Sequence, residues 1–246
     1  MLDGMRAMLR KAAKMMHLCG IRGGIRAVLR HGVAATTEHK VFLTGRHFQT
    51  ILDVGANRGQ FSLAARHYNP EARIIAFEPL AAAAKVFHAL FAQDPLVTLH
   101  VTAIGPQRGF ADMQVSSRED SSSLLPISDK LTDLYPGTEK NGSIHVPVAP
   151  LPDFVAAESL TGTTLLKIDV QGFELEVLKS ALPILPRLTA IYVEVSFVRF
   201  YLGQALAWQV IDFLHANGFK ITGFYNHNYD HRSGIVVQSD MLFEPR

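Results

Sequence analysis

The chain has 246 residues, of which 48 % are hydrophobic and 19 % are charged, and these values predict one large α/β domain with a short extension. A net charge of +2 gives no general basis for nucleic-acid binding, so we expect no nucleic-acid partner. Cys19 is the only cysteine, which excludes an intramolecular disulfide and a cysteine-based zinc site and favours a reducing, cytoplasmic setting. No apolar run reaches the length of about 18 residues that a transmembrane helix needs.

Residues 1–45 are predicted to form a basic amphipathic helical extension, and residues 46–246 the main domain. The first 36 residues contain one acid, Asp3, and many basic residues, namely Arg6, Arg10, Lys11, Lys14, Arg22, Arg26 and Arg30. Apolar residues recur at helical spacing, at Leu2, Met5, Leu9, Ala12 and Met16 and then at Ile21, Ile25 and Val28. This stripe can pack on the main domain or on a second copy of the chain, as in a homodimer. Alternatively, residues 1–30 can lie on an anionic membrane surface, which would make the protein membrane-peripheral.

The stretch ILDVGANRG, residues 51–59, predicts a strand, a glycine turn and the start of a helix. The apolar strand ends at Asp53, and Gly55 and Gly59 follow. Glycine permits a close backbone approach to a ligand, and the helix N-terminus adds free N–H donors. The spacing Gly-x-x-x-Gly differs from the Gly-x-Gly-x-x-Gly of dinucleotide enzymes. With Asp53 two residues before the first glycine, it favours S-adenosylmethionine enzymes.

Strands and helices then alternate, which predicts parallel strands joined by right-handed crossovers. We expect strands at 73–77 and 97–104 and a helix at 81–91. Glu78 follows the second strand, and in this topology it lies beside the glycine turn. A carboxylate at that place can accept hydrogen bonds from both ribose hydroxyls of an adenosine.

The middle of the chain, residues 105–150, has weaker patterns. GFADMQVS and SIHVPVAP are predicted as additional strands, SREDSSSLLP as a serine-rich turn, and LTDLYPGTEKNGS as a surface loop. An insertion of this length beyond the carboxyl edge of a sheet often lines the functional site.

A second strand–turn–helix unit spans TLLKIDVQGFELEVLKS, residues 164–180. Asp169 falls at the carboxyl end of its strand, and is therefore expected to project into the crevice near the first glycine turn. Glu174 lies in the first turn of the next helix, where the helix dipole stabilises a carboxylate. In the following strand, 190–197, Glu194 interrupts an apolar run and must either face the crevice or pair with a basic residue.

The closing segments predict a helix at 204–217, a strand in FKITGF, a polar loop in YNHNYDHRSG and a last strand in GIVVQSDMLFEP. Two strands joined by a loop of this kind suggest an antiparallel pair at the edge of the sheet.

Taken together, the motifs resemble the FkbM family of S-adenosylmethionine-dependent methyltransferases over about residues 50–244. The residues that carry this resemblance are LDVGANRGQFS, AFEP, SSSL, LLKIDVQGFELEVLKSA, YVEVSF and SDMLF. The resemblance implies a class I methyltransferase (Rossmann-like) α/β fold with about seven strands, the last antiparallel. It also implies S-adenosylmethionine as cofactor and O-methylation of a hydroxyl on a sugar, polysaccharide, glycolipid or natural product. Gln171 stands where the family often has Glu.

Positions that match the family motifs are assigned to cofactor binding, together with Ala103 near the end of the third strand: Asp53, Gly55, Asn57, Gly59, Glu78 and Ala103. An alcohol must lose its proton during attack on the methyl group, and the predicted catalytic bases are Asp169 and Glu194. His145 and the group His227, Asp230 and His231 are alternatives. The sequence has no metal-specific spacing, so we expect no obligatory metal.

Two other functions stay open from the sequence. An NAD-dependent sugar epimerase or reductase shares the fold and the acid after the second strand, but the third glycine is misplaced and Tyr135 is followed by Glu139 instead of the lysine of a Tyr-x-x-x-Lys pair. A membrane-peripheral module with a degenerate nucleoside pocket is the non-enzymatic alternative. A P-loop kinase is disfavoured because the Gly-x-x-x-x-Gly-Lys motif is absent.

Overall fold

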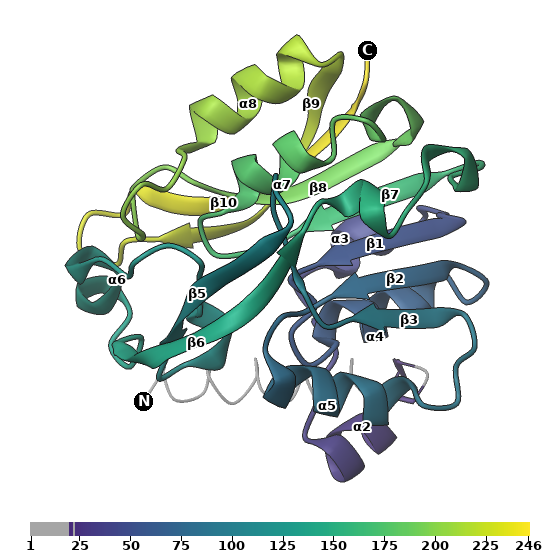
Figure 1. The fold of residues 1–246 in the computed structure, drawn as a ribbon, viewed down its shortest axis with the longest axis horizontal. Coiled ribbons are helices and arrows are strands. Elements are labelled where there is room, and N and C mark those ends of the chain that lie inside the picture. The colour runs from purple at the N-terminus through teal and green to yellow at the C-terminus, as the bar shows by residue number, and fades with distance from the viewer. Residues whose placement is uncertain (1–19, 22) are drawn as a thin grey trace.

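A seven-stranded sheet forms the centre of the molecule, which is described here by a computed structural model of residues 20, 21 and 23–246 (Figure 1). In spatial order its strands are β3 (Val97–His100), β2 (Arg73–Phe77), β1 (Thr50–Val54), β7 (Thr164–Ile168), β8 (Ala190–Ser196), β10 (Val236–Pro245) and β9 (Phe219–Tyr229). The strands from β3 to β8 are parallel, and β10 is antiparallel to both β8 and β9. The predicted α/β fold and its antiparallel edge are therefore confirmed.

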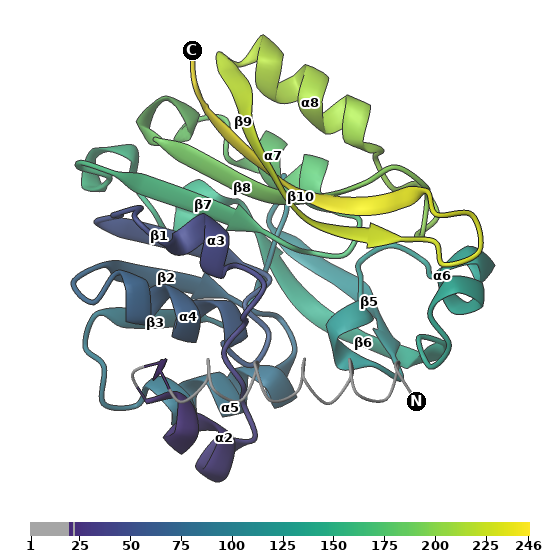
Figure 2. The same ribbon diagram turned by 180° about the vertical axis from the view of Figure 1, so that it is seen from behind.

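Helices cover both faces of this sheet, because alternate residues of each strand point to opposite sides. On β1, Ile51 packs with α3 (Lys40–Leu43), α4 (Gln60–Tyr68) and α5 (Ala81–Phe91). Its neighbours Leu52 and Val54 pack with α7 (Glu174–Ser180) and α8 (Ala207–Ala216). Figure 2 shows α3 and α4 on one face, and Figure 1 shows α7 and α8 on the other. Both faces of β1 and β7 are thus buried.

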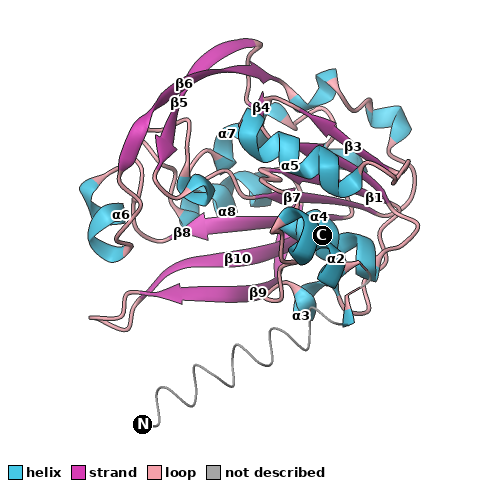
Figure 3. Cartoon of the chain, turned by 90° about the horizontal axis from the view of Figure 1, so that it is seen from below, coloured by secondary structure: helices cyan, strands magenta, loops and turns pink. Residues whose placement is uncertain are grey.

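A second, three-stranded sheet stands beside the carboxyl end of the first (Figure 3). It contains β4 (Ala103–Ile104), β6 (Lys140–Ala149) and β5 (Gly109–Ser116), in that order. The single strand predicted over 97–104 is therefore wrong. The chain turns out of the main sheet at Thr102, whose N–H donates to the carbonyl of His100, and β4 then pairs with β6.

Two predicted loops also contain regular structure. The start of LTDLYPGTEKNGS belongs to α6 (Asp129–Leu134), because Leu131 is buried against Phe200 and Tyr201. The predicted polar loop 225–234 is shorter than expected, since β9 continues to Tyr229 by pairing with β10.

The described part of the N-terminal extension packs on the main domain. Ile21, Ala27 of α2 (Gly24–His31) and Phe42 belong to the same buried cluster as β1 and α4. The predicted stripe from Leu2 to Met16 lies outside the described residues, and the domain boundary at residue 45 stays a prediction. Within the ranges that the structure describes, no helix has the length and apolarity needed to cross a membrane.

Gly55 follows β1 and lies against Asp169, the residue that follows β7, and this close approach allows a direct test of the fold. Its φ is +81°, and a Cβ there would lie 1.8 Å from the Asp169 carbonyl oxygen. Gly137 has a similar φ of +90° but open space around it. We expect Gly137→Ala to lose about 1–2 kcal/mol of unfolding free energy from the left-handed backbone alone. Gly55→Ala is expected to lose about 1–3 kcal/mol more, because the backbone must also move apart. Urea unfolding of the two variants measures the difference, and equal losses would contradict the close approach.

Candidate active site

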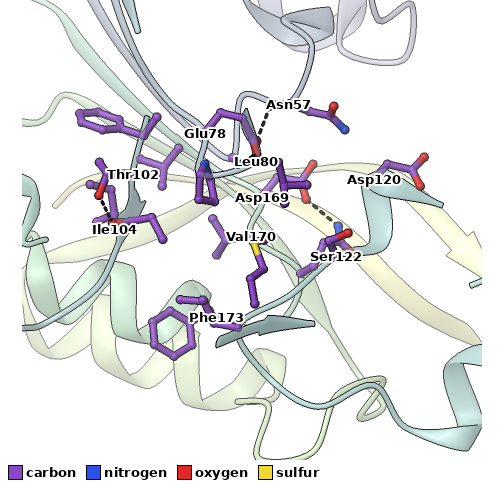
Figure 4. Close-up of a pocket in the computed structure, with 18 residues that line it drawn as sticks. Asn57, Glu78, Leu80, Thr102, Ile104, Asp120, Ser122, Asp169, Val170 and Phe173 are labelled. Carbon is purple, nitrogen blue, oxygen red and sulfur yellow. Dashed lines mark hydrogen bonds between the residues drawn. The ribbon is translucent and has the colours of Figure 1, made fainter. Parts of the chain in front are cut away.

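A cavity opens at the carboxyl ends of β1, β2 and β7 (Figure 4), with a volume of about 680 Å³ that includes its open mouth. It is closed on one side by β4 and on another by the segment that follows β5. Its lining comprises Val54, Gly55, Asn57, Phe77, Glu78, Pro79, Leu80, Thr102, Ala103, Ile104, Met113, Asp120, Ser122, Leu124, Asp169, Val170, Gln171 and Phe173. Four predicted cofactor residues, Gly55, Asn57, Glu78 and Ala103, and one predicted catalytic residue, Asp169, thus line one cavity.

The glycine turn brings backbone to the wall of this cavity. The N–H groups of Gly55 and Ala56 both donate to the Phe77 carbonyl at 3.0 Å, which ties the turn to the end of β2. Asn57 follows with a positive φ of 47°. Its buried side-chain Oδ1 has no hydrogen-bond partner among the described residues. The turn therefore contains one buried acceptor that the described residues leave unsatisfied.

Glu78 is held in place by two backbone hydrogen bonds. The N–H of Asn57 donates to its Oε2 and the N–H of Leu80 donates to its Oε1, each at 2.8 Å. Burial raises the pKa of Glu78 to about 7, although these two hydrogen bonds and the charge of Lys167 act in the opposite direction. The carboxyl group is therefore fixed in the cavity wall and titrates near neutral pH.

Lys167 was not singled out from the sequence, and it lies directly beneath the glycine turn. Its Nζ is 3.2 Å from Asp53 Oδ1 and 3.8 Å from Asp169 Oδ2, and it donates to the Gly55 carbonyl at 3.1 Å. Burial lowers the pKa of Lys167, but Asp53 and Asp169 raise it further, and the net shift is upward. The available signal was a lysine inside the buried run TLLKI, where an unpaired charge is costly.

Asp53 and Gly59 lie outside the cavity lining. Asp53 is fully buried, pairs with Lys167 and accepts a hydrogen bond of 2.6 Å from Ser62 Oγ. Gly59 precedes α4, and a Cβ there would approach the rings of Phe91 and Phe87 to 2.9 and 3.0 Å. In this geometry both residues contact protein groups around the turn, and their assignment to cofactor binding stays a prediction.

The two predicted catalytic carboxylates have different surroundings. The Asp169 side chain is 38 % exposed, and Gln171 Nε2 donates to its Oδ1 at 2.7 Å. Glu194 does not line the cavity, and it accepts a hydrogen bond of 3.0 Å from Gln238. Burial and the charge of Asp169 raise the pKa of Glu194 well above its usual value, which favours the protonated form that cannot accept a proton. Of these two carboxylates, Asp169 alone lines the cavity. None of the alternatives His145, His227, Asp230 and His231 lines the cavity.

The charge of the lining discriminates between cofactors. Among the described residues around the cavity, Glu78, Asp120 and Asp169 are acidic and none is basic. A pyrophosphate carries two negative charges and would be repelled by these carboxylates. A sulfonium cofactor is cationic, so it matches them. The geometry thus favours S-adenosylmethionine over NAD.

The family model for the methyltransferase FkbM domain matches residues 53–221. The chain belongs to the FkbM methyltransferase family. It is 27 % identical to the 2-O-methyltransferase NoeI of Sinorhizobium fredii (strain NBRC 101917 / NGR234) over 171 residues, which cover 67 % of this chain and 70 % of that protein. It is 28 % identical to Methyltransferase 1 of Beauveria bassiana (strain ARSEF 2860) over 142 residues, which cover 52 % of this chain and 57 % of that protein.

Solved structures with a related arrangement include the precorrin-6y C5,15-methyltransferase of Geobacter metallireducens GS-15. That comparison has a TM-score of 0.46 and 12 % sequence identity and covers 87 % of this chain and 94 % of that one. The fibrillarin pre-rRNA processing protein of Methanococcus jannaschii gives a TM-score of 0.44 with 12 % identity, over 80 % of this chain and 66 % of that one.

This FkbM methyltransferase uses S-adenosylmethionine, and the cavity fits that cofactor. The contact between Gly55 and the Asp169 carbonyl leaves no room for a Cβ, and Asn57 Oδ1 is a buried acceptor without a partner among the described residues. Glu78 is the residue that would accept from the ribose hydroxyls, while Thr102 and Ala103 would border the adenine.

The pKa of Glu78 predicts a pH-dependent cofactor affinity. The carboxylate form accepts two hydroxyl hydrogen bonds, whereas a protonated carboxyl presents a donor of its own. Because the pKa of free Glu78 is about 7, we expect affinity for S-adenosylhomocysteine to rise between pH 6 and pH 8. The expected increase in affinity is about tenfold, because the cofactor binds the deprotonated form of Glu78 and the fraction of that form rises across this pH range. Calorimetry across this range measures it, and Glu78→Gln is expected to bind weakly with a flat profile. A flat profile in the native protein would contradict the role of Glu78.

Proposed function

We propose that the protein O-methylates a hydroxyl of a sugar, glycolipid, polysaccharide or natural-product acceptor. The observation that carries this proposal is the position of Asp169, whose carboxylate reaches the cofactor cavity and is oriented by Gln171. A hydroxyl acceptor needs its proton removed as it attacks, and a positioned carboxylate can take that proton. The similarity to a protein named 2-O-methyltransferase supports oxygen as the acceptor atom.

In this mechanism the chain mainly positions the reactants. The bound cofactor supplies an activated methyl group for in-line displacement. Glu78 orients the ribose, and Asp169 holds the acceptor hydroxyl about 3 Å from its target while accepting the proton. Gln171 keeps Asp169 in one orientation, because the Tyr201 hydroxyl lies 3.0 Å from Gln171 Oε1. The ammonium of Lys167 balances the charges of Asp53 and Asp169 from below.

Asp169→Asn tests the base directly, since the two side chains have the same shape and the amide oxygen can still accept from Gln171. We expect affinity for S-adenosylhomocysteine to change less than about threefold and methyl transfer to fall about 10²–10⁴-fold. Transfer of labelled methyl groups to a panel of methyl glycosides and glycolipid extracts measures the rate. Asp112→Asn is the control, because Asp112 is exposed on β5 and outside the cavity. Equal turnover of the native protein and the Asp169→Asn variant would show that Asp169 is not the base.

The exposed side of α2 supports a proposal of peripheral membrane contact. Leu29 is 80 % exposed and Ile25 is 50 % exposed, and Arg26 and Arg30 accompany them on the same short helix. Apolar side chains next to arginines match the boundary between acyl chains and anionic headgroups. A homodimer that covers the same side chains stays a prediction.

Vesicle co-sedimentation tests this contact. We expect the native protein to bind vesicles of phosphatidylcholine with phosphatidylglycerol, and to bind phosphatidylcholine alone much more weakly. The double variant Ile25→Glu and Leu29→Glu is expected to lower binding about tenfold, because it places two charges among the acyl chains. Trp208→Glu is the control, since Trp208 is exposed on α8. Unchanged binding of the double variant, or no binding to anionic vesicles, would contradict the proposal.

A further inference from the structure

Hydrogen bonds hold the segment between β5 and α6 over one end of the cofactor cavity. Ser123 Oγ donates to the Gln171 carbonyl at 2.6 Å, and the Tyr201 hydroxyl lies 3.0 Å from the Ser121 carbonyl. Ser123 also exchanges two backbone hydrogen bonds with Gln114 of β5, at 2.7 and 3.1 Å. These contacts fix residues 121–123 against the turn that follows β7, and they place Asp120 beside the catalytic end of the cavity.

Asp120 stands where this cavity meets a second one. The second cavity has a volume of about 920 Å³ including its open mouth, and its lining includes Asn57, Arg118 and Asp120. Asn57 and Asp120 line both cavities. In Figure 4, Thr102 and Ile104 lie on one side of Glu78, and Asp120 lies on the other. A ligand whose ribose contacts Glu78 and whose base lies near Thr102 would therefore direct its remaining end toward Asp120.

The charges of Arg118 and Asp120, where the two cavities meet, complement those of an α-amino acid. Arg118 pairs with Asp120 through a contact of 3.1 Å, and both side chains are about half exposed, at 52 and 55 %. An anion and a cation held side by side complement an α-amino acid, which carries an ammonium and a carboxylate on one carbon.

We propose that Asp120 and Arg118 recognise the amino-acid end of the cofactor, with Asp120 accepting hydrogen bonds from its ammonium and Arg118 binding its carboxylate. This inference rests on the proposed binding of the adenosyl part at Glu78. It makes the inserted segment a determinant of cofactor specificity. The site distinguishes S-adenosylhomocysteine from 5′-methylthioadenosine, which has the same nucleoside and sulfur but no amino acid.

Calorimetry with three probes tests the assignment without knowledge of the methyl acceptor. The probes are S-adenosylhomocysteine, its decarboxylated analogue and 5′-methylthioadenosine. We expect Asp120→Asn to weaken both amine-containing probes about tenfold, because a charged hydrogen bond is lost. Arg118→Gln is expected to weaken S-adenosylhomocysteine by a similar factor and to leave the decarboxylated analogue unchanged. Neither variant is expected to change the affinity for 5′-methylthioadenosine.

Asp112→Asn is the matched control, because it removes a nearby exposed carboxylate that lines neither cavity. Asp120 and Arg118 are on the surface, so circular dichroism is expected to show native folding in each variant. An equal loss of affinity for all three probes, or no loss of affinity for S-adenosylhomocysteine, would overturn the assignment. The second of these results would indicate that the methyl acceptor, and not the cofactor, occupies the second cavity. If the native protein bound none of the probes, the failure would lie with the proposed function instead.

Discussion

The ammonium of Lys167 is the charge on which the carboxyl end of the sheet depends. Lys167 is a buried residue of β7 and its ammonium lies over the Phe61 ring of α4, so it must be paired within the protein. Asp53 and Asp169 supply opposite charges from the two strands, and the Gly55 carbonyl supplies a hydrogen bond from the turn. One buried group therefore holds the cofactor turn and the proposed base in a common frame.

That frame explains why the two glycines of the first motif differ in role. Gly55 has the Asp169 carbonyl against it, so the close approach of two strand ends excludes a side chain. Gly59 meets aromatic rings of α5 and sets the packing of the helix that follows. A motif that looks like a single ligand-binding loop is thus one contact with the opposite strand and one contact with the core.

The sequence predicted the strand ends that carry Asp53, Glu78 and Asp169, because each follows an apolar run and parallel strands bring such ends together. It did not predict the turn at Thr102, which depends on pairing of β4 with the distant β6. Helix α6 was missed for a similar reason, since Leu131 is buried by residues about 70 positions away. Asp120 lies in a short 3-10 helix within a serine-rich stretch that has no periodicity, and its importance is visible only from the two cavities that it lines.

The strand order has a consequence for how the chain folds during synthesis. β10 lies between β8 and β9, although it leaves the ribosome after both of them. Until it emerges, β9 has no neighbour in the sheet and β8 is an open edge. Exposed strand edges are prone to pair with other chains, so the interval before β10 arrives is a period of aggregation risk. The strands from β1 to β3, which carry Asp53 and Glu78 at their ends, can form before this interval, whereas the edge made by β8, β10 and β9 is completed last.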